Sequence, residues 1–145
     1  MKVFAKNRDA RNYKILEKFE AGIVLSGFEV KSIKSGLISL SGSRVIIHQG
    51  NAFLIGANIS PFQPQNAPLN FNPHRTKRLL LNKSEIKELI GKSSGGLTII
   101  PLKVYSKGVR IKIEIALASS LKKFEKREKI KEKEVKRKLR EGNWE

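Results

Sequence analysis

The sequence predicts a mainly β fold: a small antiparallel β-barrel with flanking helices, followed by a basic C-terminal tail. Three observations support this fold class. Short apolar runs with strand-like alternation recur through residues 13–120, two capped helices interrupt them, and glycines stand where strands would turn. About five to seven short strands with glycine at the corners are typical of barrels of the oligonucleotide-binding (OB-fold) type. At 145 residues, the chain is expected to hold one such domain.

The first half of the chain contains one clear strand-to-helix transition. Residues 1–12 are polar and basic, and we expect them to form an N-terminal arm outside the barrel domain of residues 13–120. Residues 13–25 are predicted to form a strand, in which Gly22 suggests a bulge or a barrel corner. Ser26 and Glu29 then give the Ser-x-x-Glu signature of a capping box for a helix over residues 27–35, which Gly36 ends.

The remaining elements follow the same logic. Strands are predicted over residues 38–48 and 51–59, with a tight turn at Gly50. Residues 60–73 contain four prolines and three asparagines and are expected to be irregular. A brief strand over residues 79–81 precedes a second helix, with Asn82 as N-cap, Glu85 three residues later and Gly91 at its end. A final hairpin joins residues 98–105 to residues 109–117, where apolar and charged residues alternate.

The composition favours a polyanionic partner. The formal net charge is +17, and 19 of the 30 basic residues but only 7 of the 13 acidic residues lie in residues 1–120. The basic excess therefore belongs mainly to the predicted barrel. A field of that sign most often attracts nucleic acid, with an anionic membrane as the competing partner. No apolar run has the length of a membrane span and no lipidation motif is present, so no membrane association is expected.

Residues for catalysis or metal binding are scarce. The chain has no cysteine, which suits a cytoplasmic protein, and a single aspartate, Asp9. His48 and His74 stand far apart without partners at metal-ligand spacing. Gly91-Lys92-Ser93 resembles the end of a P-loop, but Ile86 stands where the motif needs glycine. We therefore expect no catalytic residue, no metal and no cofactor, and we do not expect an enzyme.

The tail, residues 121–145, is dominated by lysine and glutamate and has no continuous apolar stripe. Such a segment cannot dock on a core by burial, so we expect it to be disordered or a solvated helix that orders on a partner. In the barrel, three groups of basic residues are candidate phosphate contacts, although each could be ordinary solvated surface. They are Lys6, Arg8 and Arg11; Lys31 and Lys34; and Arg75, Lys77 and Arg78.

Several motifs lie in the order found in one bacterial family. They are Asn-Arg-Asp-Ala at 7–10, Phe-Glu-Ala-Gly-Ile-Val-Leu-x-Gly-x-Glu-Val-Lys-Ser-Ile-Lys-x-Gly at 19–36, Pro-His-Arg-Thr-Lys-Arg-Leu-Leu-Leu at 73–81 and Lys-Lys-Phe-Glu-Lys-Arg-Glu at 122–128. Together they closely resemble the small protein B (SmpB) family, the SsrA-binding proteins. The resemblance covers nearly the whole chain.

The resemblance implies a non-enzymatic partner of transfer-messenger RNA. Such a protein binds the tRNA-like domain of that RNA, supports its aminoacylation by alanyl-tRNA synthetase, and delivers it with elongation factor Tu to stalled ribosomes for trans-translation. The tail then occupies the empty mRNA channel near the decoding centre. We expect a cytoplasmic monomer. Two alternatives remain: a ribosomal or single-strand-binding module on the same barrel, and an RNA-processing enzyme.

Carried over by position, the family's RNA-binding residues fall on Asn7, Glu20, Leu80 and Asn82. Glu20 could instead pair with a neighbouring cation, Leu80 could belong to the core, and Asn82 could simply cap its helix. With the basic candidates, the expected RNA-binding set is Asn7, Arg8, Glu20, Lys31, Lys34, Arg75, Lys77, Arg78, Leu80 and Asn82. The expected ribosome-binding residues of the tail are Lys122, Lys123, Phe124, Glu125, Lys126, Arg127, Lys131 and Lys136.

Overall fold

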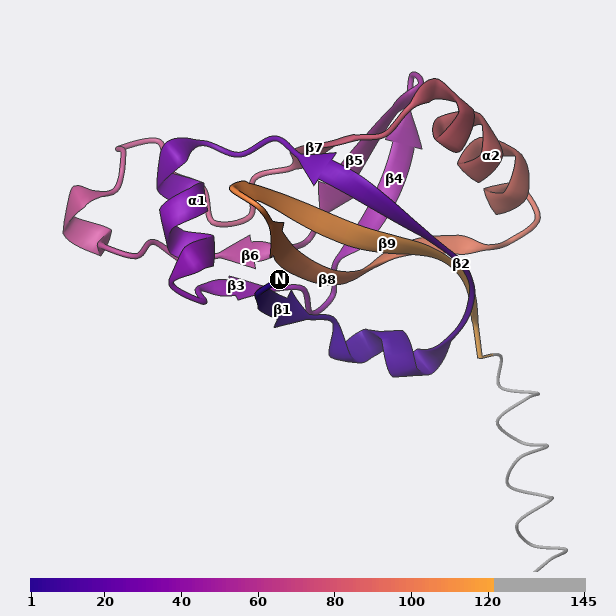
Figure 1. Ribbon diagram of the computed structural model, residues 1–145, viewed down its shortest axis with the longest axis horizontal. Coiled ribbons are helices and arrows are strands. Elements are labelled where there is room, and N and C mark those ends of the chain that lie inside the picture. The colour runs from indigo at the N-terminus through magenta and orange to yellow at the C-terminus, as the bar shows by residue number, and fades with distance from the viewer. Residues whose placement is uncertain (122–145) are drawn as a thin grey trace, which may run out of the picture.

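A closed antiparallel barrel forms the body of the computed structural model, which describes residues 1–121 (Figure 1). Within these residues, one sheet has the strand order β1-β8-β4-β5-β7-β2-β9, and pairing of β9 with β8 closes it. The strands are β1 (Val3–Lys6), β2 (Tyr13–Ile23), β4 (Arg44–His48), β5 (Asn51–Ile55), β7 (Lys77–Leu80), β8 (Thr98–Lys107) and β9 (Arg110–Ser120). The prediction of an antiparallel barrel with flanking helices is confirmed.

The core fills the barrel from the inward positions of each strand. Ile113, Ile115 and Leu117 alternate along β9 and are almost completely buried, as is Val104 of β8. Helices α1 (Gly27–Lys34) and α2 (Lys83–Ser93) lie at opposite ends of the molecule in Figure 1. Each helix contributes a buried aliphatic residue, Ile33 from α1 and Leu89 from α2.

The N-terminal segment lies in the sheet, which differs from the arm expected from the sequence. Strand β1 pairs with β8, with Lys6 opposite Lys103, and a short 3-10 helix η1 (Arg8–Asn12) follows it. Asn7 is buried between them: its side chain accepts a hydrogen bond from Asp9 N at 3.0 Å and donates one to the Pro101 carbonyl at 2.8 Å. The partners of this segment are distant in sequence, so local composition did not indicate the pairing.

The two strands predicted over residues 38–59 are each divided. Residues Ile38–Ser39 (β3) and Asn58–Ile59 (β6) form a separate two-stranded sheet, while the hairpin of β4 and β5 belongs to the barrel. The division falls where two parts of the chain pass close to each other. A Cβ on Gly56 would lie only 2.8 Å from the Gly42 carbonyl oxygen. The predicted turn at Gly50 is confirmed, with positive φ at both Gln49 and Gly50.

Both predicted capping boxes are present. Ser26 Oγ accepts from Glu29 N at 3.2 Å, and the Glu29 carboxylate accepts from Ser26 N at 2.9 Å. Asn82 and Glu85 make the same reciprocal pair at the start of α2. Helix α2 runs to Ser93, past the glycine expected to end it, because a single glycine weakens a helix without breaking it.

Glu29 has a second role as the centre of an ionic cluster. Its carboxylate accepts from Arg75 Nη2 at 2.6 Å and from Arg75 Nε at 3.1 Å, and Lys77 Nζ donates to the Arg75 carbonyl at 2.6 Å. Burial opposes the charge of Glu29, but hydrogen bonds from Arg75 and from Ser26 N hold the pKa of the carboxyl below its usual value. Burial lowers the pKa of Lys77, whose side chain is fully enclosed. This Glu29 cluster (Glu29, Arg75, Lys77) ties the start of α1 to the segment that leads into β7.

Residues 60–73 are irregular as predicted, apart from the short 3-10 helix η2 (Pro64–Asn66). An aromatic cluster holds this excursion against α1. The ring of Phe28 lies 4.6 Å from that of Phe62 and 5.0 Å from that of Phe71, measured between centroids.

The two capping boxes offer a matched test of the Glu29 cluster. We expect Glu29→Ala to lower the free energy of unfolding by about 2–4 kcal/mol, because it removes a cap and leaves Arg75 and Lys77 without their carboxylate. Glu85→Ala removes the equivalent cap on an exposed helix start and should cost only about 0.5–1 kcal/mol. Chemical denaturation measures both values, and equal losses would contradict the role of the cluster.

The lowered pKa of Glu29 also predicts an acid dependence. A carboxyl whose folded-state pKa lies below its unfolded value of 4.5 stabilises the fold above that pH, and the contribution is lost as the pH falls through the folded pKa. Below about pH 4.5, the free energy of unfolding of the wild type should therefore fall more steeply than that of Glu29→Gln. If the free energies of unfolding of the two proteins fell equally steeply below about pH 4.5, this expectation would be refuted.

Candidate nucleic-acid interface

Four neighbouring strands, β7, β2, β9 and β8, present a continuous outer surface. Their registers align Leu80, Gly22, Lys112 and Tyr105 in one row across the strands. A second row aligns Glu20, Glu114 and Lys103. We call this surface the four-strand face. Its outward residues are Arg78 and Leu80 of β7, Glu20 and Gly22 of β2, Arg110, Lys112 and Glu114 of β9, and Lys103 and Lys107 of β8. Tyr105 of β8 belongs to the same row but is buried.

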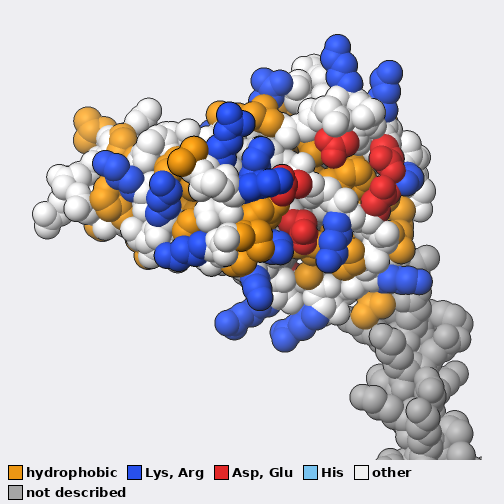
Figure 2. Space-filling view, in the orientation of Figure 1, with side chains coloured by type: hydrophobic (Ala, Val, Ile, Leu, Met, Phe, Trp, Pro, Cys, Tyr) orange, Lys and Arg blue, Asp and Glu red, His pale blue; other side chains and the backbone are white. Residues whose placement is uncertain are grey.

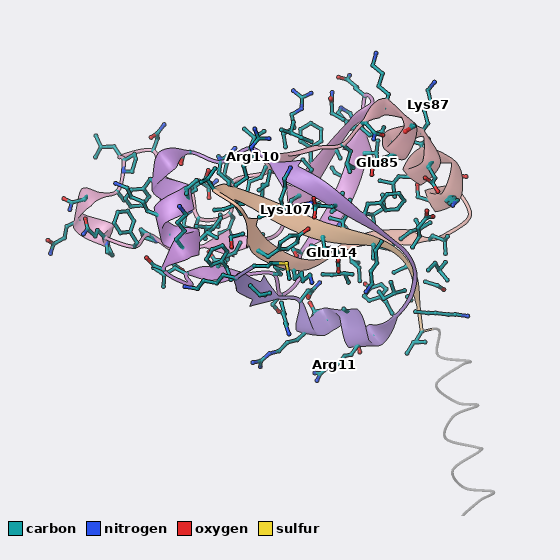
Figure 3. The ribbon with its side chains drawn as sticks, in the orientation of Figure 1. Arg11, Glu85, Lys87, Lys107, Arg110 and Glu114 are labelled. Carbon is teal, nitrogen blue, oxygen red and sulfur yellow. The ribbon has the colours of Figure 1, made fainter. Side chains whose placement is uncertain are left out.

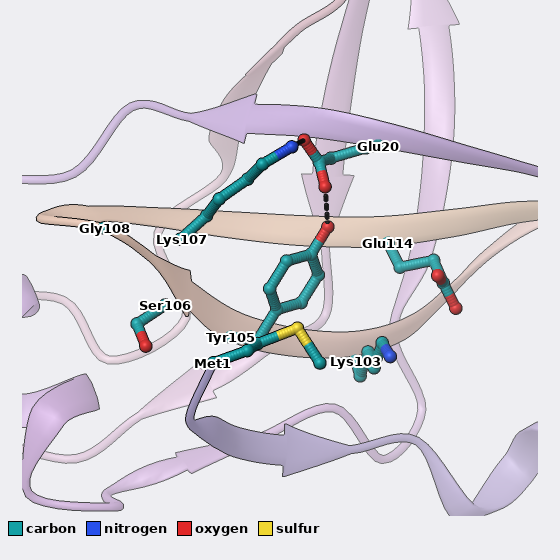
Figure 4. A pocket seen from close by; sticks show the side chains of 8 residues that line it. All are labelled: Met1, Glu20, Lys103, Tyr105, Ser106, Lys107, Gly108 and Glu114. Atoms are coloured by element: carbon teal, nitrogen blue, oxygen red, sulfur yellow. Dashed lines mark hydrogen bonds and ion pairs between the residues drawn. The ribbon is translucent and has the colours of Figure 1, made fainter.

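Glu20 lies at the centre of this face (Figure 4). Lys107 Nζ donates to Glu20 Oε1 at 3.0 Å, and the Tyr105 hydroxyl donates to Glu20 Oε2. The hydrogen bond from Tyr105 and then that from Lys107 lower the pKa of Glu20, so its carboxylate is ionised at neutral pH. Burial and the bond to Glu20 raise the pKa of Tyr105, which keeps its hydroxyl a donor.

A cavity of about 450 Å³ opens beside this carboxylate. Acidic and basic side chains line it, with Glu114 facing it from β9 and Lys103 from β8 (Figure 4). Ionised acceptors and donors of this kind suit the donors and acceptors of bases and ribose hydroxyls. Glu20 does form the ion pair with a neighbouring cation that the sequence left open as an alternative, here with Lys107. It is also exposed beside an open cavity.

Leu80 and Arg78 also face outward. Leu80 is 52% exposed and is not part of the core. Arg78 is exposed and donates to the Asn51 side chain at 2.9 Å. Asn82 caps α2 as the sequence suggested, and it remains exposed at the end of the same strand.

Two of the basic candidates differ from the expectation. Lys77 is completely buried, because it shares the inward side of β7 with Leu79, and it cannot meet an RNA phosphate directly. Arg75 is partly exposed, but its guanidinium is held by Glu29, by the Val24 carbonyl at 3.1 Å and by the Thr76 carbonyl at 3.2 Å. These residues stabilise the fold around the interface.

The other candidates lie in other elements or outside the described residues. Asn7 is buried and positions the start of η1, whereas Arg8 is exposed. Lys31 and Lys34 are exposed on α1, and Lys31 Nζ lies 5.9 Å from the centroid of the Phe62 ring. The tail residues from Lys122 onward lie outside the residues that the structure describes.

The structure adds four cations that we did not select from the sequence: Lys103, Lys107, Arg110 and Lys112. The last three lie around the β8–β9 turn, and Figure 3 places Lys107 and Arg110 on the same side of the barrel as Glu114. The alternation of charged with apolar residues along β9 was the available signal, since it puts every charged residue on the outer face. In Figure 2, basic side chains are spread over this view, with a smaller group of acidic ones among them.

Residues 1–121 contain no group of three or more side chains arranged to hold a metal ion. Among the helices of the same region, none has the length and apolar character needed to span a membrane.

Comparison with known proteins shows the family of this chain. A model of the SmpB protein family matches residues 4–143. An SsrA-binding protein of Persephonella marina is 51% identical over 96% of this chain and 92% of its own length, and one from a Sulfurihydrogenibium strain is 49% identical over 95% and 91%. A chain from a solved structure described as "tmRNA-SmpB: a journey to the center of the bacterial ribosome" has 37% identity and a TM-score of 0.68, covering 81% of this chain and 84% of that one. The chain therefore belongs to the SmpB family of SsrA-binding proteins.

Proposed function

We propose that this chain binds the tRNA-like domain of transfer-messenger RNA in the cytoplasm and brings it to stalled ribosomes for trans-translation. The observation that carries the proposal is the four-strand face, where an ionised carboxylate is held among exposed cations. Family membership supports it, since the relatives are SsrA-binding proteins and a structural relative is described with tmRNA and the ribosome.

The face offers two kinds of contact. Arg78, Lys107, Arg110 and Lys112 are suited to phosphates, which supply affinity with little selectivity. Glu20 repels phosphate and accepts hydrogen bonds, so it favours a base edge or a 2′-hydroxyl in a particular geometry. The combination favours a folded RNA whose shape places both kinds of group correctly.

Among the predicted RNA-binding residues, the proposal retains the exposed ones other than Arg75, whose guanidinium is held by Glu29 and two backbone carbonyls. They are Arg8, Glu20, Lys31, Lys34, Arg78, Leu80 and Asn82. Asn7 and Arg75 are assigned as positioning residues, and Lys77 as a buried structural residue. The protein acts by binding, without a reaction of its own.

Delivery would involve alanyl-tRNA synthetase, which charges the same RNA, and elongation factor Tu. The tail would occupy the vacant mRNA channel near the decoding centre through Lys122, Lys123, Phe124, Glu125, Lys126, Arg127, Lys131 and Lys136. Its 11 basic residues suit a channel lined by RNA phosphates.

A competition titration at fixed salt tests the RNA-binding proposal. We expect the full chain to prefer the tRNA-like domain of tmRNA over an unstructured oligonucleotide of equal length. Contact with roughly five to eight phosphates would give a log–log salt slope of about −4 to −7. Equal affinity for the two RNAs would instead favour the single-strand-binding alternative.

Glu20→Gln should weaken binding of the tRNA-like domain by about tenfold to a hundredfold, because hydrogen bonds to an ionised acceptor are strong. Glu17→Gln is the matched control: Glu17 lies on the same strand and pairs with Lys92 at 2.7 Å, away from the cavity. It should bind as the wild type does. If both variants bound normally, Glu20 would not be a contact residue.

Truncation after Leu121 separates the barrel from the tail. The cut leaves β9 complete, because Ser119 and Ser120 pair with Lys14 and Tyr13. We expect the truncated protein to retain most of its affinity for tmRNA and to lose peptide tagging on stalled ribosomes in a reconstituted translation assay. A loss of most RNA affinity on truncation would contradict this division of roles.

A further inference from the structure

Tyr105 lies on the outer side of β8 and is nevertheless only 4% exposed. Its register partner Lys112 and the next residue of the same row, Gly22, belong to the four-strand face. Lys103 Nζ lies 5.4 Å from the centroid of the Tyr105 ring, within range of a cation–π contact. The ring therefore has a well-defined position, and its hydroxyl points to the Glu20 carboxylate (Figure 4).

Glu20 reaches this hydroxyl across a whole strand. Strand β9 lies between β2, which carries Glu20, and β8, which carries Tyr105. The residue directly opposite Glu20 on β9 is Glu114, a second carboxylate, which offers no donor and repels the charge of Glu20. The side-chain donors that hold Glu20 therefore come from β8, and the Tyr105 hydroxyl is one of them.

The two donors from β8 differ in how firmly they are placed. Lys107 Nζ donates to Glu20 Oε1 at 3.0 Å, but its side chain is 65% exposed, and such a surface ion pair maintains its geometry only weakly. An RNA phosphate can also compete for this ammonium group. Tyr105 is buried, and its backbone is paired on both sides, with Val3 of β1 and Lys112 of β9. Its hydroxyl is therefore the more rigid of the two donors.

This arrangement leaves part of the Glu20 carboxylate available. An ionised carboxylate has about four acceptor positions, and Tyr105 and Lys107 each occupy one, on different oxygens. About two positions remain. The Glu20 side chain is 39% exposed and lines the cavity, so these positions are accessible. Holding one oxygen fixes the direction of the remaining acceptors, which reduces the cost of ordering the side chain when a donor binds.

We propose that Tyr105 is a positioning residue for RNA binding. Its buried hydroxyl holds Glu20 Oε2, so that the carboxylate presents its remaining acceptor positions to an RNA donor in one orientation. Tyr105 does this without touching the RNA itself. The inference rests on the proposed RNA-binding function and adds to it a residue that acts only through Glu20.

Tyr105→Phe in the full chain tests the proposal, because it keeps the buried ring and removes only the hydroxyl. We expect this variant to bind the tRNA-like domain about three- to tenfold more weakly than the wild type, since Glu20 is still present but is no longer oriented. The chain's other tyrosine, Tyr13, provides the matched control. It lies on β2 opposite Ser120 and does not line the Glu20 cavity, so Tyr13→Phe should bind as the wild type does.

A double-mutant cycle with Glu20→Ala separates positioning from a purely structural role. The carboxylate is absent in the Glu20→Ala background, so Tyr105→Phe should leave the remaining RNA affinity unchanged there. A loss by the same factor in both backgrounds would overturn the proposal, because Tyr105 would then act without Glu20. Wild-type affinity of Tyr105→Phe in the otherwise native chain would also overturn it.

Titration of Glu20 in the free protein gives an independent measurement. The hydrogen bond from Tyr105 is the largest cause that lowers the pKa of the Glu20 carboxyl, followed by the hydrogen bond from Lys107, and the charge of Lys112 also lowers it. In Tyr105→Phe this pKa should therefore rise toward its usual value, whereas Tyr13→Phe should leave it unchanged. NMR of the side-chain carboxyl carbon measures both. An unchanged pKa in Tyr105→Phe would overturn the proposal, because the hydroxyl would not be holding the carboxylate.

The same measurements distinguish failure of this inference from failure of the proposed function. If Glu20→Ala binds the tRNA-like domain as the wild type does, the Glu20 contact of the proposed function fails, and the positioning role of Tyr105 fails with it. If Glu20→Ala weakens binding while Tyr105→Phe does not, only the positioning role fails.

Discussion

Closure of the barrel determines which side chains are accessible to a binding partner. Because β9 pairs with β8 along nearly its whole length and with β2 on its other side, every residue of these strands points either into the core or away from it. Ile113 and Ile115 fill the interior, and Lys112 and Glu114 are thereby directed outward. The same alternation separates Arg78 from Lys77. The interface is thus a consequence of core packing, and a shift of one residue in register would exchange the two sets.

Local patterns in the sequence predicted local structure well. The Ser26–Glu29 and Asn82–Glu85 capping boxes need only neighbours three residues apart, and the turn at Gly50 needs only a residue that tolerates positive φ. The barrel itself followed from strand-length apolar runs. The family resemblance, now supported by the matching relatives, supplied Glu20 and Leu80, which no local pattern would have selected.

The sequence did not predict the features that depend on residues far apart in the chain. Asn7 is held by Pro101, and Arg75 by Glu29, through contacts between segments 94 and 46 residues apart. The cluster Arg75-Lys77-Arg78 looks uniform in sequence, yet one member is buried, one is paired and one faces outward. The close crossing at Gly42 and Gly56 likewise depends on tertiary packing. In each case, the residue was visible in the sequence, but its partner in the fold was not.

The buried ammonium of Lys77 allows chemical labelling to report on opening of the fold. Its amine is enclosed in the barrel and bonded to the Arg75 carbonyl, so an amine-reactive reagent reaches it only when the barrel opens. Surface lysines such as Lys107 and Lys112 respond instead to whatever covers the four-strand face. Peptide mapping after one labelling reaction therefore measures two things in the same molecule. Labelling of Lys77 measures opening of the fold, and labelling of Lys107 and Lys112 measures how far the four-strand face is covered.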